Sequence, residues 1–335
     1  MPPRWHARGD PMHMSRKFLV PAVALALAST LGAARAEDYP DRPVRIVIPF
    51  APGGSNDIVG RLIGEELSKS LGQPFIVDNR GGAGGTIGTE VVAKSRPDGY
   101  TLLLISTPHT ANSTLYKKLS YDPNKDFAPI ARLATAPLLI SVYPGLPVKT
   151  LSDLIAYAKA NPGKLNYVSS GVGSSQHLVS ELFEIRAGIS MTHVPYKGAG
   201  AALTDVAAGH AQVSVGTVLQ ALPHVKANRL RPLAVSGNQR QPVLPEVPTV
   251  QEAGLAGYDG DNWWGILAPA GTPPAVVDKL SKTIGDILAK PEMRQRLAAE
   301  SASVAYLSPE PFGKFMAGET TKWAELIKRL GIQAD

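Results

Sequence analysis

The apolar positions of this chain fall into short continuous runs, separated by glycine-containing turns and by stretches with apolar residues at helical spacing. Residues 44–50 form one such run, rich in β-branched side chains, which is typical of a strand buried in a parallel sheet. Between residues 58 and 67 the apolar residues recur every three or four positions, which predicts an amphipathic helix. Further strands are predicted at 75–78 and 98–106, so strands and helices alternate.

The same alternation returns between residues 136 and 237. Each predicted strand there is followed by a turn and then by an apolar face at helical spacing, and the tail from residue 274 onward is predicted to be helical. Alternating strands and helices predict an α/β fold. Two runs of this pattern in 335 residues predict two domains, each a doubly wound sheet flanked by helices.

The N-terminal residues show a pattern of another kind. Arg16 and Lys17 precede a short apolar run, and Ala34-Arg35-Ala36 follows it, which is typical of a secretory signal peptide cleaved after Ala36. The apolar run at 19–31 is too short to span a bilayer. The chain contains no cysteine that could carry a lipid anchor. We therefore expect residues 1–36 to be a signal peptide and the mature chain to be exported.

Removal of the signal peptide changes the charge balance. The full chain has a formal net charge of +6, but residues 1–36 hold five basic residues and one acidic residue, so the mature chain carries only +2. This balance gives no reason to expect a nucleic-acid partner. The absence of cysteine also means that no disulfide stabilises the exported fold, so the hydrophobic core must do so.

Catalytic motifs are missing or incomplete. The glycines of residues 81–88 do not complete the dinucleotide fingerprint, and neither the phosphate-binding loop nor the G-x-S-x-G turn of hydrolases occurs. Ser174 and Ser175 lie close to His177 in the sequence, which leaves an exported serine hydrolase as an alternative. The other histidines lack metal-ligand spacing. We expect no metal, no cofactor and no enzymatic activity.

Small polar residues follow several predicted strands, at the end where open α/β sheets bind ligands. They include residues 55–57, 106–107 and 169–176. The turn before Ser55 brings permissive glycine backbone to a helix start, where unpaired N–H groups and the helix dipole favour an anion. Each residue alone is more commonly a helix cap, and Ser55 and Asp57 are candidate N-caps. As a set, they predict a cleft that receives a carboxylate.

Seven segments resemble the periplasmic solute receptors of tripartite tricarboxylate transporters, often called Bug-type receptors. In chain order they are YPDRPVRIVIPFAPGGSNDIVGRL, VDNRGGAGGTIG, PDGYTLLL, LNYVSSGVGSSQHL, HVPYKGAGAALTDVAAG, LPEVPTVQEAG and APAGTPPAVVDKL, which span essentially the whole mature chain. The resemblance implies a two-domain periplasmic binding protein of the Venus-flytrap type. It implies domain 1 at 37–135 and 262–335, domain 2 at 136–261, and crossings near 134–141 and 257–267.

The resemblance also implies a function. Such a receptor captures a small carboxylate (di-, tri- or aromatic) in the cleft between its domains and delivers it to the membrane permease subunits of the transporter. It is a periplasmic monomer and not an enzyme; a sensor that presents ligand to a histidine kinase is an alternative. The residues that the resemblance assigns to ligand binding are Pro52, Gly53, Gly54, Ser55, Asp57, Gly173, Ser174, Ser175, Tyr196, Lys197 and Gly198. The predicted ligand-binding residues also include Ser106 and Thr107, which follow a predicted strand, and Thr217 and Trp263, which lie where the chain departs from the family pattern.

Two departures from the family pattern fall where such receptors choose a ligand. Gly216-Thr217 stands where many relatives carry an acidic or amide pair, which argues against an amino-acid ligand because no acid would meet its ammonium group. The segment Asp261-Asn262-Trp263-Trp264 is bulkier than the common pattern. Trp263 is expected to stack on a flat aromatic acid, and packing at the crossing is the alternative for both tryptophans.

Overall fold

The computed structural model describes residues 1, 3, 4 and 39–334. Most of the predicted signal peptide, with its cleavage site, lies outside the described residues. From Pro40 onward the chain forms one compact unit. Within the described residues, no helix has both the length and the apolar character needed to cross a bilayer.

The first sheet has six strands in the order β11-β4-β10-β3-β1-β2. β1 pairs in parallel with β2 and β3, whereas β10 runs antiparallel to β3 and β4, and β11 runs antiparallel to β4. Its strands are β1 (Val44–Ile48), β2 (Phe75–Asn79), β3 (Thr101–Ser106), β4 (Phe127–Ala136), β10 (Asn262–Pro269) and β11 (Ser303–Leu307). The helices on this part of the chain are α2 (Ser55–Leu71), η2 (Ala83–Gly85), α3 (Thr86–Ala93), α4 (Pro108–Leu115), α9 (Pro274–Ala289), α10 (Pro291–Ala299) and α11 (Pro309–Leu330).

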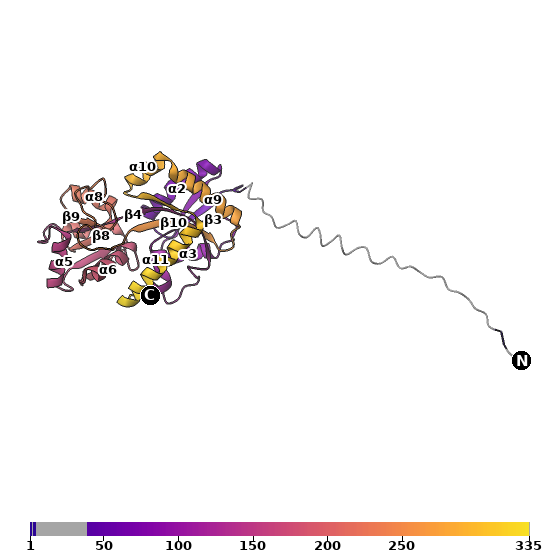
Figure 1. The fold of residues 1–335 in the computed structure, drawn as a ribbon, viewed down its shortest axis with the longest axis horizontal. Helices are drawn as coiled ribbons and strands as arrows, with labels where there is room; N and C mark the ends of the chain where they lie inside the picture. The colour runs from indigo at the N-terminus through magenta and orange to yellow at the C-terminus, as the bar shows by residue number, and fades with distance from the viewer. Residues whose placement is uncertain (2, 5–38, 335) are drawn as a thin grey trace. The chain divides into compact units, whose positions relative to one another are not determined.

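The second sheet has five strands in the order β7-β6-β8-β5-β9. β6 is parallel to β7 and β8, and β5 is antiparallel to β8 and β9. The strands are β5 (Leu138–Val142), β6 (Asn166–Ser169), β7 (Thr192–Pro195), β8 (Val213–Thr217) and β9 (Arg231–Val235), and the helices are α5 (Leu151–Ala160), α6 (Ser175–Ala187), α7 (Ala199–Ala208) and α8 (Val218–Lys226). Figure 1 shows α5, α6 and α8 grouped with β8 and β9.

Alternate side chains of the first sheet face different helices, as the two-residue period of a strand requires. Val47 and Leu103 face α3 and the start of α11, in a core cluster that Phe312 completes. On the opposite face, α2 comes so close to β1 that a Cβ on Gly60 would lie 2.4 Å from Cδ1 of Ile48. The glycine therefore permits the helix to pack directly on the strand.

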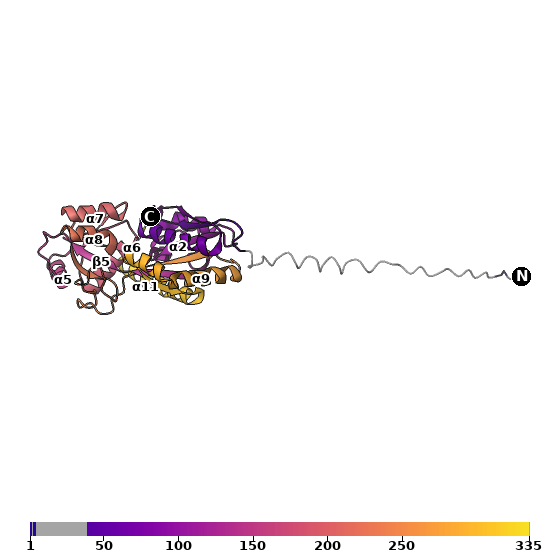
Figure 2. The ribbon, with the colours of Figure 1, turned by 90° about the horizontal axis from the view of Figure 1, so that it is seen from above.

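The hydrophobic core of the second sheet includes side chains from helices that follow strands of the first sheet. Its larger cluster contains residues of α5 and α6, together with Leu115 of α4 and Trp323 and Ile327 of α11. Figure 2 shows α11 and α6 in a view turned by 90° from that of Figure 1. One continuous apolar cluster thus joins elements of both sheets.

The structure confirms the predicted α/β two-domain fold with helices flanking the sheets, but the sheets are mixed. The residues of β4 and β10 were assigned partly to crossings, and the prediction of a wholly helical tail is wrong because β11 lies within it. Gly265 interrupts the apolar run of β10 in the sequence, and the pairing of β10 with β4 shifts in register at this glycine. The chain leaves the first sheet after Ala136 and re-enters it at Asn262. The predicted domain limits stay a prediction.

Candidate functional site

The loop between β1 and α2 places several backbone donors together. Gly54 is the N-cap residue of α2, without a side-chain cap, and Gly53 has a φ of 82°, a left-handed conformation that favours glycine. The N–H groups of Gly54, Ser55 and Asn56 have no acceptor within the described part of the chain. Three donors at the positive end of a helix can therefore meet an anion.

Asp57 holds this loop in place. Its carboxylate accepts the N–H of Gly53 at 2.9 Å and forms an ion pair with Arg61 at 3.0 Å. Burial raises the pKa of Asp57, but hydrogen bonds from Arg61 and Gly53 outweigh this effect and hold the pKa below its ordinary value. The carboxylate is therefore ionised and engaged. Neither Ser55 nor Asp57 is the N-cap, because Gly54 holds that position. Ser55 is the first residue of the helix, and Asp57 lies in its first turn and accepts the N–H of Gly53.

The loop between β6 and α6 is the second group of donors. Ser174 is the N-cap of α6, and its Oγ accepts the N–H of His177 at 3.3 Å. Gly173, with a φ of 76°, donates its own N–H to Nδ1 of His177 at 3.1 Å. The N–H groups of Ser175 and Gln176 have no acceptor among the residues that the structure describes. This helix start therefore also presents free donors.

The rings of His177 and His193 pack against the β6–α6 loop and hydrogen-bond to it. The His177 ring is buried and stacks on His193, with 4.0 Å between the ring centroids. Nε2 of His193 lies 2.7 Å from Oγ of Ser169. Burial lowers the pKa of His177 to about 3, with a smaller effect of His193, and burial lowers the pKa of His193 to about 4. Both rings are therefore neutral at physiological pH.

The same geometry gives no support to the hydrolase alternative. A serine nucleophile needs its hydroxyl within hydrogen-bond reach of a basic ring nitrogen. Nδ1 of His177 is occupied by Gly173, and Nε2 lies 3.6 Å from Glu181. Among the described residues, the Ser174 hydroxyl bonds only to the backbone N–H of His177, and the Ser175 hydroxyl donates to Asn262.

Strand β10 connects the two loops. Oγ of Ser175 donates to Oδ1 of Asn262 at 2.7 Å, and Nε1 of Trp264 donates to Oδ1 of Asn56 at 2.7 Å. Asn262 and Trp264 are two residues apart on the strand, so their side chains leave the same face, about 7 Å apart along it. The starts of α2 and α6 therefore converge on the first residues of β10.

Ser106 and Thr107 lie at the end of β3, beside this region. Ser106 pairs with Trp264 in the ladder between β3 and β10. Thr107 is fully buried, and its Oγ1 has no hydrogen-bond partner among the described residues. Both predicted residues are thus brought close to the converging loops.

The remaining predicted residues follow strands of the second sheet. Thr217 is the N-cap of α8, and its Oγ1 donates to Gln220 at 3.0 Å. Gly198 is the N-cap of α7, Lys197 beside it is exposed, and Tyr196 donates its hydroxyl to Asp205. β7 and β8 are the two neighbours of β6 in the sheet, so these residues follow the same sheet edge as the β6–α6 loop.

Trp263 corrects the expectation of a stacking side chain. It points to the opposite face of β10 from Trp264, where it is 1 % exposed, its ring edges meet Phe312 and Phe315, and its indole N–H donates to Glu319 at 3.0 Å. A ring enclosed in this way has no free face for a ligand. The packing alternative applies to Trp263, whereas Trp264 packs and also holds Asn56.

Three residues that shape the loops, although they lie in segments that the sequence analysis singled out, are absent from the predicted ligand-binding residues. Asn56 and Asn262 accept the bonds that tie both loops to β10, and Gln176 accepts the N–H of Ser170 at 2.7 Å. All three are amides at the start of a helix or strand. An amide beside a glycine-rich turn was the available signal.

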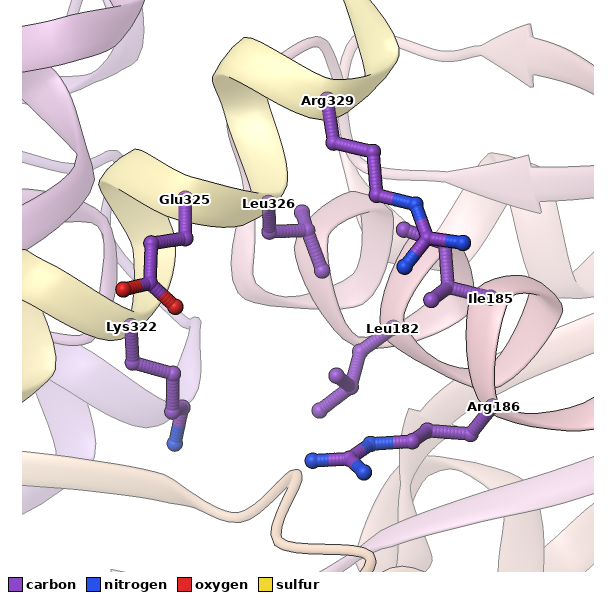
Figure 3. A pocket seen from close by; sticks show the side chains of 7 residues that line it. All are labelled: Leu182, Ile185, Arg186, Lys322, Glu325, Leu326 and Arg329. Atoms are coloured by element: carbon purple, nitrogen blue, oxygen red, sulfur yellow. The ribbon is translucent and has the colours of Figure 1, made fainter.

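A surface cavity of about 560 Å³ lies apart from these loops. Figure 3 shows its lining, Leu182, Ile185 and Arg186 of α6 with Lys322, Glu325, Leu326 and Arg329 of α11, which includes none of the predicted ligand residues. Among the described residues, no group of three or more histidine or acidic side chains is arranged to hold a metal ion.

Comparison with known proteins matches most of the chain to one family model. The model described as "Tripartite tricarboxylate transporter family receptor" matches residues 59–332. The protein BugT of Bordetella pertussis is 35% identical over 324 residues, which cover 96% of this chain and 99% of BugT.

Two similar solved structures have a bound carboxylate in their descriptions. Rpa4515 of R. palustris, described with adipate, superposes with a TM-score of 0.81 at 37% identity and covers 88% of this chain and 99% of its own. MatC (Rpa3494) from Rhodopseudomonas palustris, described with bound malate, superposes with a TM-score of 0.75 at 34% identity, and the match covers 86% of this chain and 100% of MatC.

Proposed function

Because the chain belongs to the tripartite tricarboxylate transporter receptor family, we propose that it is a periplasmic, monomeric receptor that captures a dicarboxylate and delivers it to the membrane permease of such a transporter. The proposal includes an N-terminal signal peptide cleaved after Ala36 and no enzymatic activity. The adipate and malate in the descriptions of two relatives support the ligand class.

One observation carries the proposal for the site. The starts of α2 and α6 each leave consecutive backbone N–H groups without an acceptor in the described residues, and both starts are tied to one face of β10. Two such helix starts suit a ligand with negative charge at two ends. We propose that Gly54 and Ser55 hold one carboxylate, and that Ser174 and Ser175 hold the other.

The ligand is proposed to be aliphatic. The only argument for a flat aromatic acid came from Trp263, whose ring is enclosed in the core. Thr107 contributes a buried hydroxyl without a described partner near β10, which suits a hydrogen bond to a polar ligand. No observation favours the histidine-kinase sensor, and it is not proposed.

The test is calorimetric titration of the exported protein with adipate, malate, citrate and benzoate. We expect adipate or malate to bind and to be recovered unchanged. Gly54→Val is the informative variant, because a Cβ there would lie 3.9 Å from its nearest neighbour, Ala51 O, and fits the fold. The branched side chain would shield the N–H donors and weaken binding by about tenfold or more, about 1.4 kcal/mol.

Gly318→Val is the matched control. A Cβ at Gly318 would meet nothing within 4 Å, and this residue lies within α11 and belongs to neither donor loop. It should keep wild-type affinity. Wild-type affinity in Gly54→Val would remove the α2 start from the site, and chemical conversion of a bound carboxylate would overturn the receptor proposal.

A further inference from the structure

We propose that Asn262 and Trp264 are positioning residues that fix the separation between the starts of α2 and α6, and thereby select the distance between the two charged ends of the ligand. This inference rests on the proposed function and adds to it a residue-level cause of selectivity. It follows from the two hydrogen bonds on one face of β10.

Trp264 fixes the start of α2. Its side chain is 1 % exposed and held by the ladder pairing of β10 with both β3 and β4, so the indole has little freedom. Its Nε1 donates to Asn56, the second residue of α2, whose own backbone N–H has no acceptor among the described residues. The bond therefore fixes the N–H donors at the start of α2 relative to β10, a central strand of the first sheet.

Asn262 fixes the start of α6. It is the first residue of β10 and 4 % exposed, and its backbone oxygen accepts the hydroxyl of Thr135 at 3.0 Å. Its side-chain oxygen accepts the Ser175 hydroxyl, so the bond joins a strand of the first sheet to a helix of the second. The N–H donors at the start of α6 are thus fixed relative to β10 as well.

A fixed gap between two anion sites discriminates between ligand lengths. If a dicarboxylate is one methylene too short or too long, one of its carboxylates cannot reach its donors unless the ligand bends. In a fitted site, one methylene changes affinity by about tenfold or more. If either tether is released, its helix start can adjust to the ligand. The prediction is therefore a loss of length selectivity rather than a uniform loss of affinity.

The adjacent tryptophans supply a matched control pair. Trp264→Phe removes the bond to Asn56, whereas Trp263→Phe removes a similar buried bond, to Glu319, on the other face of β10. Both variants shrink a buried indole in the same strand, so both should lose comparable stability. Only Trp264→Phe releases a donor loop.

The experiment measures dissociation constants for malonate, succinate, glutarate, adipate, pimelate and suberate. We expect the wild type and Trp263→Phe to prefer one length by about tenfold over its neighbours, and Trp264→Phe, Asn56→Ala and Asn262→Ala to flatten this preference to about twofold. Asn56→Ala acts at a partly exposed residue, and it decides the test if Trp264→Phe does not fold. Asn262→Ala combined with Ser175→Ala should be non-additive, since both remove one bond.

The outcomes separate the inference from the function on which it rests. If the wild type binds no dicarboxylate of any length, the proposed function fails and the inference with it. If the wild type binds with a clear preference that Trp264→Phe and Asn56→Ala retain, the function stands and the positioning role is overturned. Equal flattening by Trp263→Phe would also overturn it, because the effect would then come from the strand as a whole.

Discussion

The imidazole rings of His177 and His193 stack face to face, with 4.0 Å between their centroids and an interplanar angle of 16°. Each ring bonds to one end of the β6–α6 loop: His177 accepts the N–H of Gly173, and His193 meets the hydroxyl of Ser169. The loop proposed to hold a carboxylate therefore rests on two rings that burial keeps neutral.

The histidine pair should make the fold sensitive to acid. The pKa of His193 is about 4 in the folded chain, below its ordinary value of 6.5, so between these values the unfolded chain binds a proton that the folded chain does not. This contribution to stability is complete above pH 6.5 and is lost as the pH falls toward 4. His193→Phe removes the titration and keeps a ring for stacking.

Urea unfolding at pH 7 and pH 4.5 measures this effect. Wild type should lose about 1–2 kcal/mol more than His193→Phe between the two pH values. The difference between the two proteins is the relevant quantity, because other buried groups titrate in both. An equal loss in the two proteins would contradict the role of His193.

Removing the acceptor at His177 should disturb the ligand loop. His177→Phe keeps an aromatic ring against His193 but leaves the buried N–H of Gly173 unpaired, at a cost of about 1–3 kcal/mol in the free energy of unfolding. We expect weaker dicarboxylate binding as well, because Gly173 precedes the α6 donors. His177→Asn places an amide oxygen near the position of Nδ1 and should restore much of the binding. Calorimetry on both variants tests this, and failure of Asn to improve on Phe would assign the effect to packing alone.

Glu184 should make the fold sensitive to alkali. Burial raises the pKa of Glu184 to about 8, and Oε2 accepts the N–H of Met191 at 2.6 Å. Between pH 4.5 and 8 the unfolded chain loses this proton and the folded chain retains it, so stability falls as the pH rises. Glu184→Gln keeps the acceptor and removes the titration.

The gain from Glu184→Gln should therefore grow with pH. Relative to wild type, the free energy of unfolding of the variant should increase by on the order of 2 kcal/mol between pH 5 and pH 8. Thermal or urea unfolding at these two pH values measures the gain. A constant difference between the two proteins would mean that Glu184 ionises normally in the fold.

Lys197 should contribute little to ligand binding. It is exposed beside Gly198, and the proposed carboxylate donors are neutral N–H and hydroxyl groups. Lys197→Met should change adipate affinity by less than about threefold, and added salt should have a small effect, because screening acts mainly on exposed full charges. Titrations in low and high salt test this. A large effect of Lys197→Met that vanishes in high salt would instead assign the carboxylate to the lysine.

The sequence was sufficient for the features that depend on local spacing. The apolar run at 44–50 and the helical spacing at 58–67 correspond to β1 and α2, and glycine with serine marked both donor loops. It was insufficient where residues distant in the chain decide the outcome. The partner of Trp264 lies 208 positions away, and which face each tryptophan takes depends on the register of β10. Local pattern carries no information on either.

The place of β10 between β3 and β4 has a consequence for biosynthesis. All strands of the second sheet come from one uninterrupted stretch, 138–235, whereas β3 and β4 remain unjoined until Asn262–Pro269 has been made. Chains emerge from the ribosome N-terminus first, so the earliest strands to appear belong to the sheet that closes last. Unpaired strand edges invite association with other chains. A nascent polypeptide that ends before Asn262 therefore leaves these edges of β3 and β4 unpaired, and a chaperone that covers them until β10 has been made would protect the chain from aggregation.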